Sequence, residues 1–182
     1  MKKFLTVVVV IALLFAVALA AIPALFKDRI MTFVKNTANR RLTATVNFSD
    51  VDISLLKNFP RATVIVRDFS VANAAPFLGD TLFSAKTIDV TVDPLPYFRE
   101  GVVQIIALRL DEPSVYTRIL TDSLKNWRVM KPTDEQDKDT SSLALALKTY
   151  SVMNGRFRFR SESADRTFTL EEIHHEGTGD FA

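Results

Sequence analysis

Residues 42–72, LTATVNFSDVDISLLKNFPRATVIVRDFSVA, alternate apolar and polar side chains in two consecutive runs. A period of two residues is typical of a strand with one buried face. The alternation slips at Ser49-Asp50 and again at Arg67-Asp68, which indicates a β-bulge in each strand. Residues 57–60 (KNFP) separate the runs and predict a turn, because proline fixes φ and cannot donate to a ladder. This stretch therefore predicts a bent, twisted β-hairpin.

The strand pattern continues along the rest of the chain. Asn, Pro and Gly predict a loop at 73–80, and residues 131–142, which include no apolar residue, predict a second loop. Residues 143–152 fit a helix or a strand, and Asn154-Gly155 predicts a hairpin turn. Further strands are expected at 81–93, 102–110, 114–120, within 122–130 and at 166–173. The fold class is therefore mainly β: a curved antiparallel β-sheet or groove, open-ended at the C-terminus.

A long apolar segment precedes the strands. Phe4–Phe26 (FLTVVVVIALLFAVALAAIPALF) carries no charge, and a helix of this length spans roughly 35 Å, enough for a bilayer core of about 30 Å. Lys2 and Lys3 precede it, which favours a cytoplasmic N-terminus. A cleaved signal peptide is the alternative, but the apolar run continues past the small residues at 16–20 without a polar cleavage region. We expect a retained transmembrane helix, extended by a juxtamembrane helix at 27–41.

Composition limits the classes of function that the chain can have. The net charge is only +2, so the chain has no strong electrostatic attraction for nucleic acid, and no nucleic-acid partner is expected. Cysteine is absent, which excludes a disulfide framework and a thiolate metal site. Phe is abundant, at 14 residues, and Gly is scarce, at 5, a mixture that favours strands. The length that follows the apolar segment suits one domain.

No arrangement of residues typical of an enzyme is visible. The sequence has no Gly-rich phosphate loop, no Ser nucleophile elbow and no His-containing zinc motif, so we predict no catalytic, cofactor or metal site. The two histidines, His174 and His175, are neighbours on an expected strand and would point to opposite faces. Arg156, Arg158 and Arg160 share one strand face, which is either solvated or turned towards anionic lipid headgroups.

Two stretches resemble the N-terminal region of AsmA-like proteins, the family of TamB-type and AsmA-type envelope proteins. They are DVDISLLKNFPRATVIVRDFSVAN (50–73) and GDTLFSAKTIDVTVDPLPYFREGVVQIIALRLDEPSVYTRILTDSLKNW (79–127). Strands that end in Pro-containing breaks recur in this family, and the series closes on an Asn-Trp pair, here Asn126-Trp127. The apolar N-terminal segment also matches. The turn before Asn126 departs from the family pattern, since it lacks the usual glycine.

The resemblance implies a single-pass protein of the bacterial inner membrane whose main part lies in the periplasm. The implied function is non-enzymatic: an apolar β-groove would carry phospholipids towards the outer membrane and support its assembly. The implied partners are phospholipids and the inner membrane. The apolar strand residues expected to line such a groove, or else an ordinary packed core, are Val64, Val66, Ile88, Val90, Val92, Ile105 and Ile119.

A second function also fits the expected sheet. An anchored scaffold would bind another envelope protein by strand addition at an exposed sheet edge. Under either function, we expect the chain to be divided into a cytoplasmic stub (1–3), a transmembrane helix (4–26), a juxtamembrane helix (27–41), an AsmA-like β region (42–130), a flexible polar loop (131–142) and further strands that begin a longer β region (143–182).

Overall fold

The structure of the chain is a computed structural model that describes residues 31, 32, 36, 40–58, 61–96, 99, 101, 103–121, 124–131 and 143–179. Met31, Thr32 and Arg40 have helical backbone within the range where a juxtamembrane helix is expected. The expected transmembrane segment at 4–26 lies outside the described residues. Within the described part of the chain, no helix is long and apolar enough to span a membrane.

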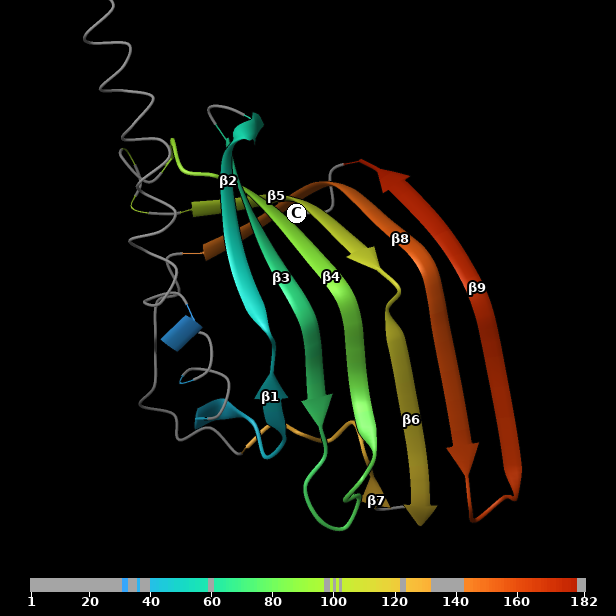
Figure 1. Cartoon of the computed structure of the whole chain (residues 1–182). Coiled ribbons are helices and arrows are strands. Elements are labelled where there is room, and N and C mark those ends of the chain that lie inside the picture. The colour runs from blue at the N-terminus through green and yellow to red at the C-terminus, as the bar shows by residue number, and fades with distance from the viewer. Residues whose placement is uncertain are drawn as a thin grey trace, which may run out of the picture.

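The described residues are dominated by one nine-stranded mixed sheet (Figure 1). The predicted strands and the predicted loop at 73–80 are confirmed, with small differences at their ends. The strands are β1 (Thr45–Asn47), β2 (Asp50–Asn58), β3 (Arg61–Ala72), β4 (Thr81–Asp93), β5 (Val103–Asp111), β6 (Ser114–Thr121), β7 (Leu124–Lys125), β8 (Leu143–Ser161) and β9 (Arg166–Thr178).

Strand pairing is antiparallel from β1 to β6, as predicted, but it becomes mixed at β8. β1 and β2 both pair with β3, and β4 pairs with β5 and then β6. β8 runs parallel to both β5 and β6, so the prediction of an antiparallel sheet is wrong at this position. The reason is the length of chain between β6 and β8. Residues 122–142 are enough for a crossover that brings β8 back to the end of the sheet where β5 begins.

The hairpin predicted at Asn154-Gly155 is also wrong. β8 continues through both residues, and the chain reverses later, between Ser161 and Arg166, where it enters β9. Asn154 has φ 55°, the left-handed conformation that Asn-Gly turns require. Here this conformation forms a bulge inside one long strand instead of a turn. Residues 143–152, which fitted a helix or a strand, belong to β8.

A line of residues with left-handed backbone crosses the sheet, and we call it the crease. It consists of Asp68 in β3, Glu112 between β5 and β6, Asn154 in β8 and Glu172 in β9, all with φ between 48° and 55°. Such values are uncommon for residues other than glycine. The slip predicted at Arg67-Asp68 is therefore confirmed. The crease separates a half of the sheet that contains β2 and β5 from a half that contains β1 and β6, and β8 bends as it crosses from one to the other (Figure 1).

The crease keeps apolar side chains on one face of both halves. At the crease the alternation of β3 and β4 slips in both strands together, so their register is the same on both sides of Asp68 and the same face stays apolar. Directly paired residues share a face, and the pairings form a continuous apolar row in each half. In the β2–β5 half this row is Val51, Val66, Ile88, Leu110 and Val152. In the β1–β6 half it is Val46, Val71, Phe83, Val115, Phe157 and Leu170. We call this side of the sheet the apolar face.

The buried core lies at the β1 end of the apolar face. Val46 and Val51 are 3% and 1% exposed and belong to one cluster with neighbouring apolar residues. Met31, Leu42 and Val129 pack against this cluster from outside the sheet. The segment after β7 returns to the start of β1, where Thr43 N donates to the Val129 carbonyl at 2.8 Å. The core therefore forms where this returning segment and the residues before β1 cover the sheet.

Candidate functional site

The structure places all seven predicted groove residues on the apolar face. Val64 pairs with Val90, Val66 with Ile88, and Val92 with Ile105, so six of them form a compact patch over β3, β4 and β5. Ile119 lies across the crease near the end of β6, four residues beyond Val115, and thus faces the same side. All seven are partly exposed. Their role in lipid binding stays a prediction.

Exposure of the apolar face increases towards β9. The row that starts at Val46, which is 3% exposed, ends at Leu170, which is 46% exposed. Phe168 lies beside it, is 51% exposed, and its ring stands 6.5 Å from the ring of Phe157. No strand pairs with the outer side of β9 within the described residues. This end of the apolar face is therefore open to a ligand.

The opposite face of the sheet is polar and is hollowed in the β2–β5 half. A hollow of about 440 Å³ extends over β3, β4, β5, β8 and β9. A row of paired small and hydroxyl side chains follows it: Thr63, Thr91, Ala107, Thr149 and Thr178. Asp89 also lines it, and the buried Oδ1 of this carboxylate has no hydrogen-bond partner among the described residues. The two faces of the sheet thus differ sharply in polarity.

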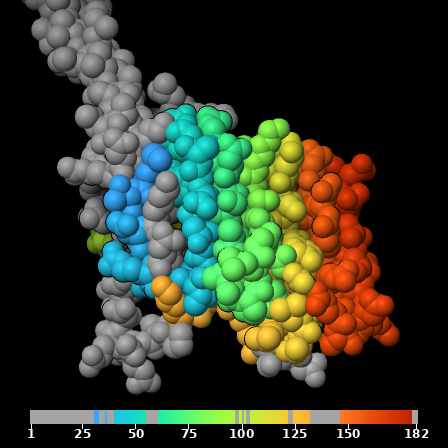
Figure 2. All heavy atoms as spheres, turned by 60° about the horizontal axis from the view of Figure 1, so that its bottom comes forward, coloured from blue at the N-terminus to red at the C-terminus, as the bar shows by residue number. Residues whose placement is uncertain are grey.

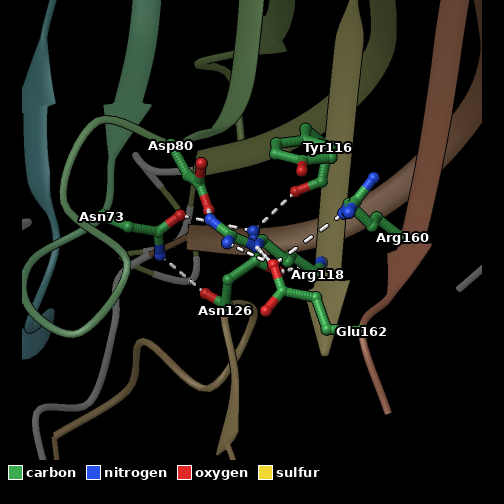
Figure 3. A network of polar contacts seen from close by, with 7 residues as sticks. All are labelled: Asn73, Asp80, Tyr116, Arg118, Asn126, Arg160 and Glu162. Carbon is green, nitrogen blue, oxygen red and sulfur yellow. Dashed lines mark hydrogen bonds and ion pairs between the residues drawn. The ribbon is translucent and has the colours of Figure 1, made fainter. Parts of the chain in front are cut away.

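A buried asparagine joins β6 to the segment that covers the core (Figure 3). Asn126 is 1% exposed. Its Oδ1 accepts from the Arg118 amide at 2.7 Å, and its Nδ2 donates to the Tyr116 carbonyl at 2.7 Å. The side-chain amide thus pairs with β6 as a peptide group of a neighbouring strand would. Because one end must accept and the other must donate, aspartate cannot replace it without loss.

The backbone of Asn126 is also fixed. Its amide donates to the Arg118 carbonyl at 3.0 Å, and its carbonyl accepts from Nδ2 of Asn73 at 2.7 Å. Asn73 is itself buried and opens the loop between β3 and β4. This loop is closed by the Asn73 amide, which donates to the Asp80 carbonyl at 2.9 Å. Asn126 therefore ties the loop, β6 and the returning segment together.

The side chain of Arg118 links the same loop to the turn between β8 and β9. Its Nη1 donates to Asp80 Oδ2 at 3.0 Å, and its Nη2 and Nε donate to Glu162 (Figure 3). Hydrogen bonds from Glu162 and then Asp80 raise the pKa of the Arg118 guanidinium well above its usual range. Glu162 also lies 3.8 Å from Nε of Arg160. The sequence patterns did not reveal this network, because its members lie far apart along the chain.

Comparison with known proteins identifies the family. The model of the AsmA family matches residues 1–173. The chain belongs to the AsmA family. No curated protein and no solved structure was found to match it.

The two residues of the Asn126-Trp127 pair, which is part of the resemblance to the AsmA family, have different surroundings in the structure. The pair closes the stretch whose resemblance to the family was noted in the sequence. Asn126 is the hydrogen-bonding member, whereas Trp127 is 38% exposed and lies 5.7 Å from the ammonium of Lys125. The asparagine of the pair thus has a structural role, because its hydrogen bonds hold β6 and the neighbouring loop together. The tryptophan contributes a partly exposed ring beside it.

Further titratable groups of this AsmA-family chain lie on both faces of the sheet, since His175 pairs with Val152 of the apolar face, whereas Asp50 pairs with Arg67 on the other face. Within the described ranges, no group of three or more His, Cys, Asp or Glu side chains is arranged to hold a metal ion. His174 and His175 are both exposed on β9, and the His175 ring stacks on Tyr150 with 5.4 Å between centroids. The carboxylates of Asp50 and Asp52 each lie 3.8 Å from Arg67. These groups form ion pairs and ring contacts at the surface.

Proposed function

We propose that this AsmA-family chain is a non-enzymatic protein of the bacterial envelope whose apolar face holds the acyl chains of phospholipids. In this proposal, residues 4–26 span the inner membrane with the N-terminus in the cytoplasm. The sheet lies in the periplasm and passes phospholipid towards the outer membrane, which supports outer-membrane assembly. Family membership, which indicates the cell envelope, supports this setting.

The observation that carries the proposal is the extent of the apolar face. In the β1–β6 half, an apolar row crosses the sheet from Val46 to Leu170 without a polar member. Burying a methylene group stabilises by about 0.8 kcal/mol, so a continuous apolar surface favours contact with a long hydrocarbon chain. A large exposed apolar patch also marks a binding site in most soluble domains. Acyl chains satisfy this surface without any specific polar contact.

The test uses two neighbouring positions of β4 that point to opposite faces. A photoreactive amino acid replaces Val90 on the apolar face or Thr91 on the polar face. After irradiation in cells, mass spectrometry of the full chain is expected to find phospholipid adducts at position 90 and far fewer at position 91. Equal yields at both positions, or no lipid at position 90, would overturn the proposal.

A second function is favoured by the edge of the sheet. β9 is 13 residues long, pairs with β8 on one side, and has no strand on its other side within the described residues. It forms the outermost band of the sheet (Figure 2). An open edge of this length offers backbone hydrogen bonds to a strand of another envelope protein.

The scaffold function makes a different prediction from lipid binding. Photoreactive residues along β9 are expected to give one discrete protein adduct in cells. Proline at a β9 amide that points away from β8 removes a donor from the edge and should abolish that adduct. Lipid adducts at position 90 with no protein adduct at β9 would reject the scaffold.

A further inference from the structure

A separate hollow of about 430 Å³ lies on the polar face, in the β1–β6 half of the sheet. Ser114 pairs with Arg156 and Tyr116 with Arg158, and these pairs alternate with Val115 and Phe157 of the apolar face. The four side chains therefore point away from the apolar face. They line the hollow together with the end of the loop between β3 and β4. We call it the arginine hollow.

The arginine hollow holds more positive than negative charge. The carboxylate of Asp80 lines it but is bound by Arg118 at 3.0 Å, which offsets its charge. Arg156 Nε lies 3.2 Å from Glu171, and both side chains are more than half exposed, so this pair is weak. Within the described residues, no carboxylate contacts Arg158. A cation without an anionic partner thus lies in a recess of the surface.

Among the described residues, the guanidinium of Arg158 makes a ring contact but no ion pair. Its guanidinium stands over the ring of Tyr116, 5.7 Å from the centroid. Stacking on a ring uses the face of the guanidinium, while the N–H groups point outwards from its edge. Arg156 lies two residues earlier on the same strand face, at a Cα spacing of about 7 Å. Two arginine side chains that start this close together and line one hollow can both donate to a tetrahedral oxyanion in it.

We propose that Arg156 and Arg158 form a binding site for a phosphate group, with the hydroxyl of Ser114 as an additional neutral donor. A phospholipid headgroup and inorganic phosphate present the same oxyanion chemistry, so either source fits the site. The site lies on the face opposite to the proposed acyl-chain surface. Its failure would leave the function proposed for the apolar face untouched, and the reverse also holds.

The first experiment titrates inorganic phosphate into the full chain in a phosphate-free maltoside detergent. Nuclear magnetic resonance of the arginine Nε–H groups follows binding. A saturable shift of the Arg156 and Arg158 signals is expected, and the Arg156 signal reports binding in the variants that lack Arg158. Arg158→Gln should weaken the affinity about tenfold or more, and Arg158→Lys should weaken it less, because it keeps the charge but loses the planar fork. Circular dichroism checks that each variant stays folded.

The matched control is Arg109→Gln. Arg109 is also exposed on the polar face and lines the other hollow beside Asp89 and Glu176. Its replacement removes the same charge from the same face, so affinity for phosphate should stay within twofold of the wild-type value. Absence of a saturable shift, or equal losses in Arg158→Gln and Arg109→Gln, would overturn the site.

A competition arm identifies the source of the phosphate. Soluble dihexanoyl phosphatidylglycerol is added to the full chain already saturated with inorganic phosphate. Displacement that is lost in Arg158→Gln supports a headgroup as ligand. Without displacement, the same phosphate titration supports a site for free phosphate.

Discussion

The apolar face starts at β1 and ends at β9, and its two ends have similar side chains but different surroundings. At the β1 end, Val46 is 3% exposed, and the segments that contain Leu42 and Val129 pack around its cluster. At the β9 end, Leu170 and Phe168 are 46% and 51% exposed. Both ends belong to the same cross-strand row or its neighbour. The covered end is thus a protein core, whereas the open end is an exposed apolar surface.

This difference shows that alternation and burial are separate properties. Alternation decides which side of a strand is apolar. Burial requires other segments to cover that side, and here the cover is supplied from beyond the sheet by residues near both ends of the 42–130 region.

The largest loss of stability is expected for Asn126→Asp, which breaks the hydrogen bonds between β6 and the segment that covers the core. A carboxylate at this 1% exposed position would lose the donor to the Tyr116 carbonyl and bury a charge. We expect a loss of about 3–5 kcal/mol in the free energy of unfolding. Urea denaturation of the full chain in neutral detergent, followed by fluorescence of its single tryptophan, measures it. The exposed Asn47→Asp serves as control, and equal losses would reject the role of Asn126.

Two substitutions in one row compare the two ends of the apolar face directly. Val46→Ala removes buried methyl groups from the core and should cost about 2 kcal/mol. Leu170→Ala removes more atoms, but from an open position, and should cost less than about 1 kcal/mol. Urea denaturation of both variants gives the difference. A larger loss for Leu170→Ala would show that the β9 end is covered in solution.

A smaller loss of stability is expected for Arg118→Met, which removes the link between the loop at 73–80 and the turn at 162–165. The substitution leaves Asp80 and Glu162 without their shared guanidinium partner. We expect a loss of about 1–2 kcal/mol, because hydrogen bonds to charged groups contribute more than neutral ones. Hydrogen exchange should accelerate in both connected turns, at 73–80 and 162–165. Arg109→Met is the control, and acceleration in neither turn would contradict the link.

The smallest effect is expected for Lys86→Gln, at an ion pair beside the crease. Lys86 Nζ lies 2.7 Å from Glu112, but both side chains are more than half exposed. The hydrogen bond from Glu112 raises the pKa of Lys86 above its ordinary value of 10.5. A raised pKa gives a contribution that is present below 10.5 and is lost only as pH rises through the folded value. This contribution is present at pH 7 but small, because both side chains are exposed to solvent. The substitution should therefore lower the thermal midpoint only slightly at pH 7, and a large decrease there would contradict the weak role of this pair.

The strands could be predicted from local patterns, because the alternation of apolar and polar residues lies within each strand. Alternation located β3, β4, β5 and β6 to within a residue or two, and the slip at Arg67-Asp68 located one position of the crease. The same reasoning failed at Asn154, because a left-handed residue serves equally in a tight turn and in a bulge. Gly155 next to it is buried, where an added Cβ would lie 3.0 Å from Cγ1 of Val152 in β8 and 3.2 Å from Cβ of Ile173 in β9. The requirement for glycine there comes from close contacts within β8 and with β9.

For the predicted groove residues, likewise, the sequence predicted their common face but not their burial. Their common face followed from their spacing, since alternation needs no knowledge of the rest of the chain. Whether each of them is covered did not follow from spacing. The network of Asn73, Asp80, Arg118, Asn126 and Glu162 gave no local signal either, because its contacts join residues up to 53 positions apart.

By itself, the sequence determined the mainly β fold, the apolar face and the position of the crease between Arg67 and Phe69, because steric preferences and alternation act over neighbouring residues. Only the tertiary structure decided that β8 runs parallel to β5 and β6, that the β1 end of the face is covered, and that Asn126 holds the cover in place. These features depend on which distant segments meet, and that choice rests on the total contacts made by the folded chain.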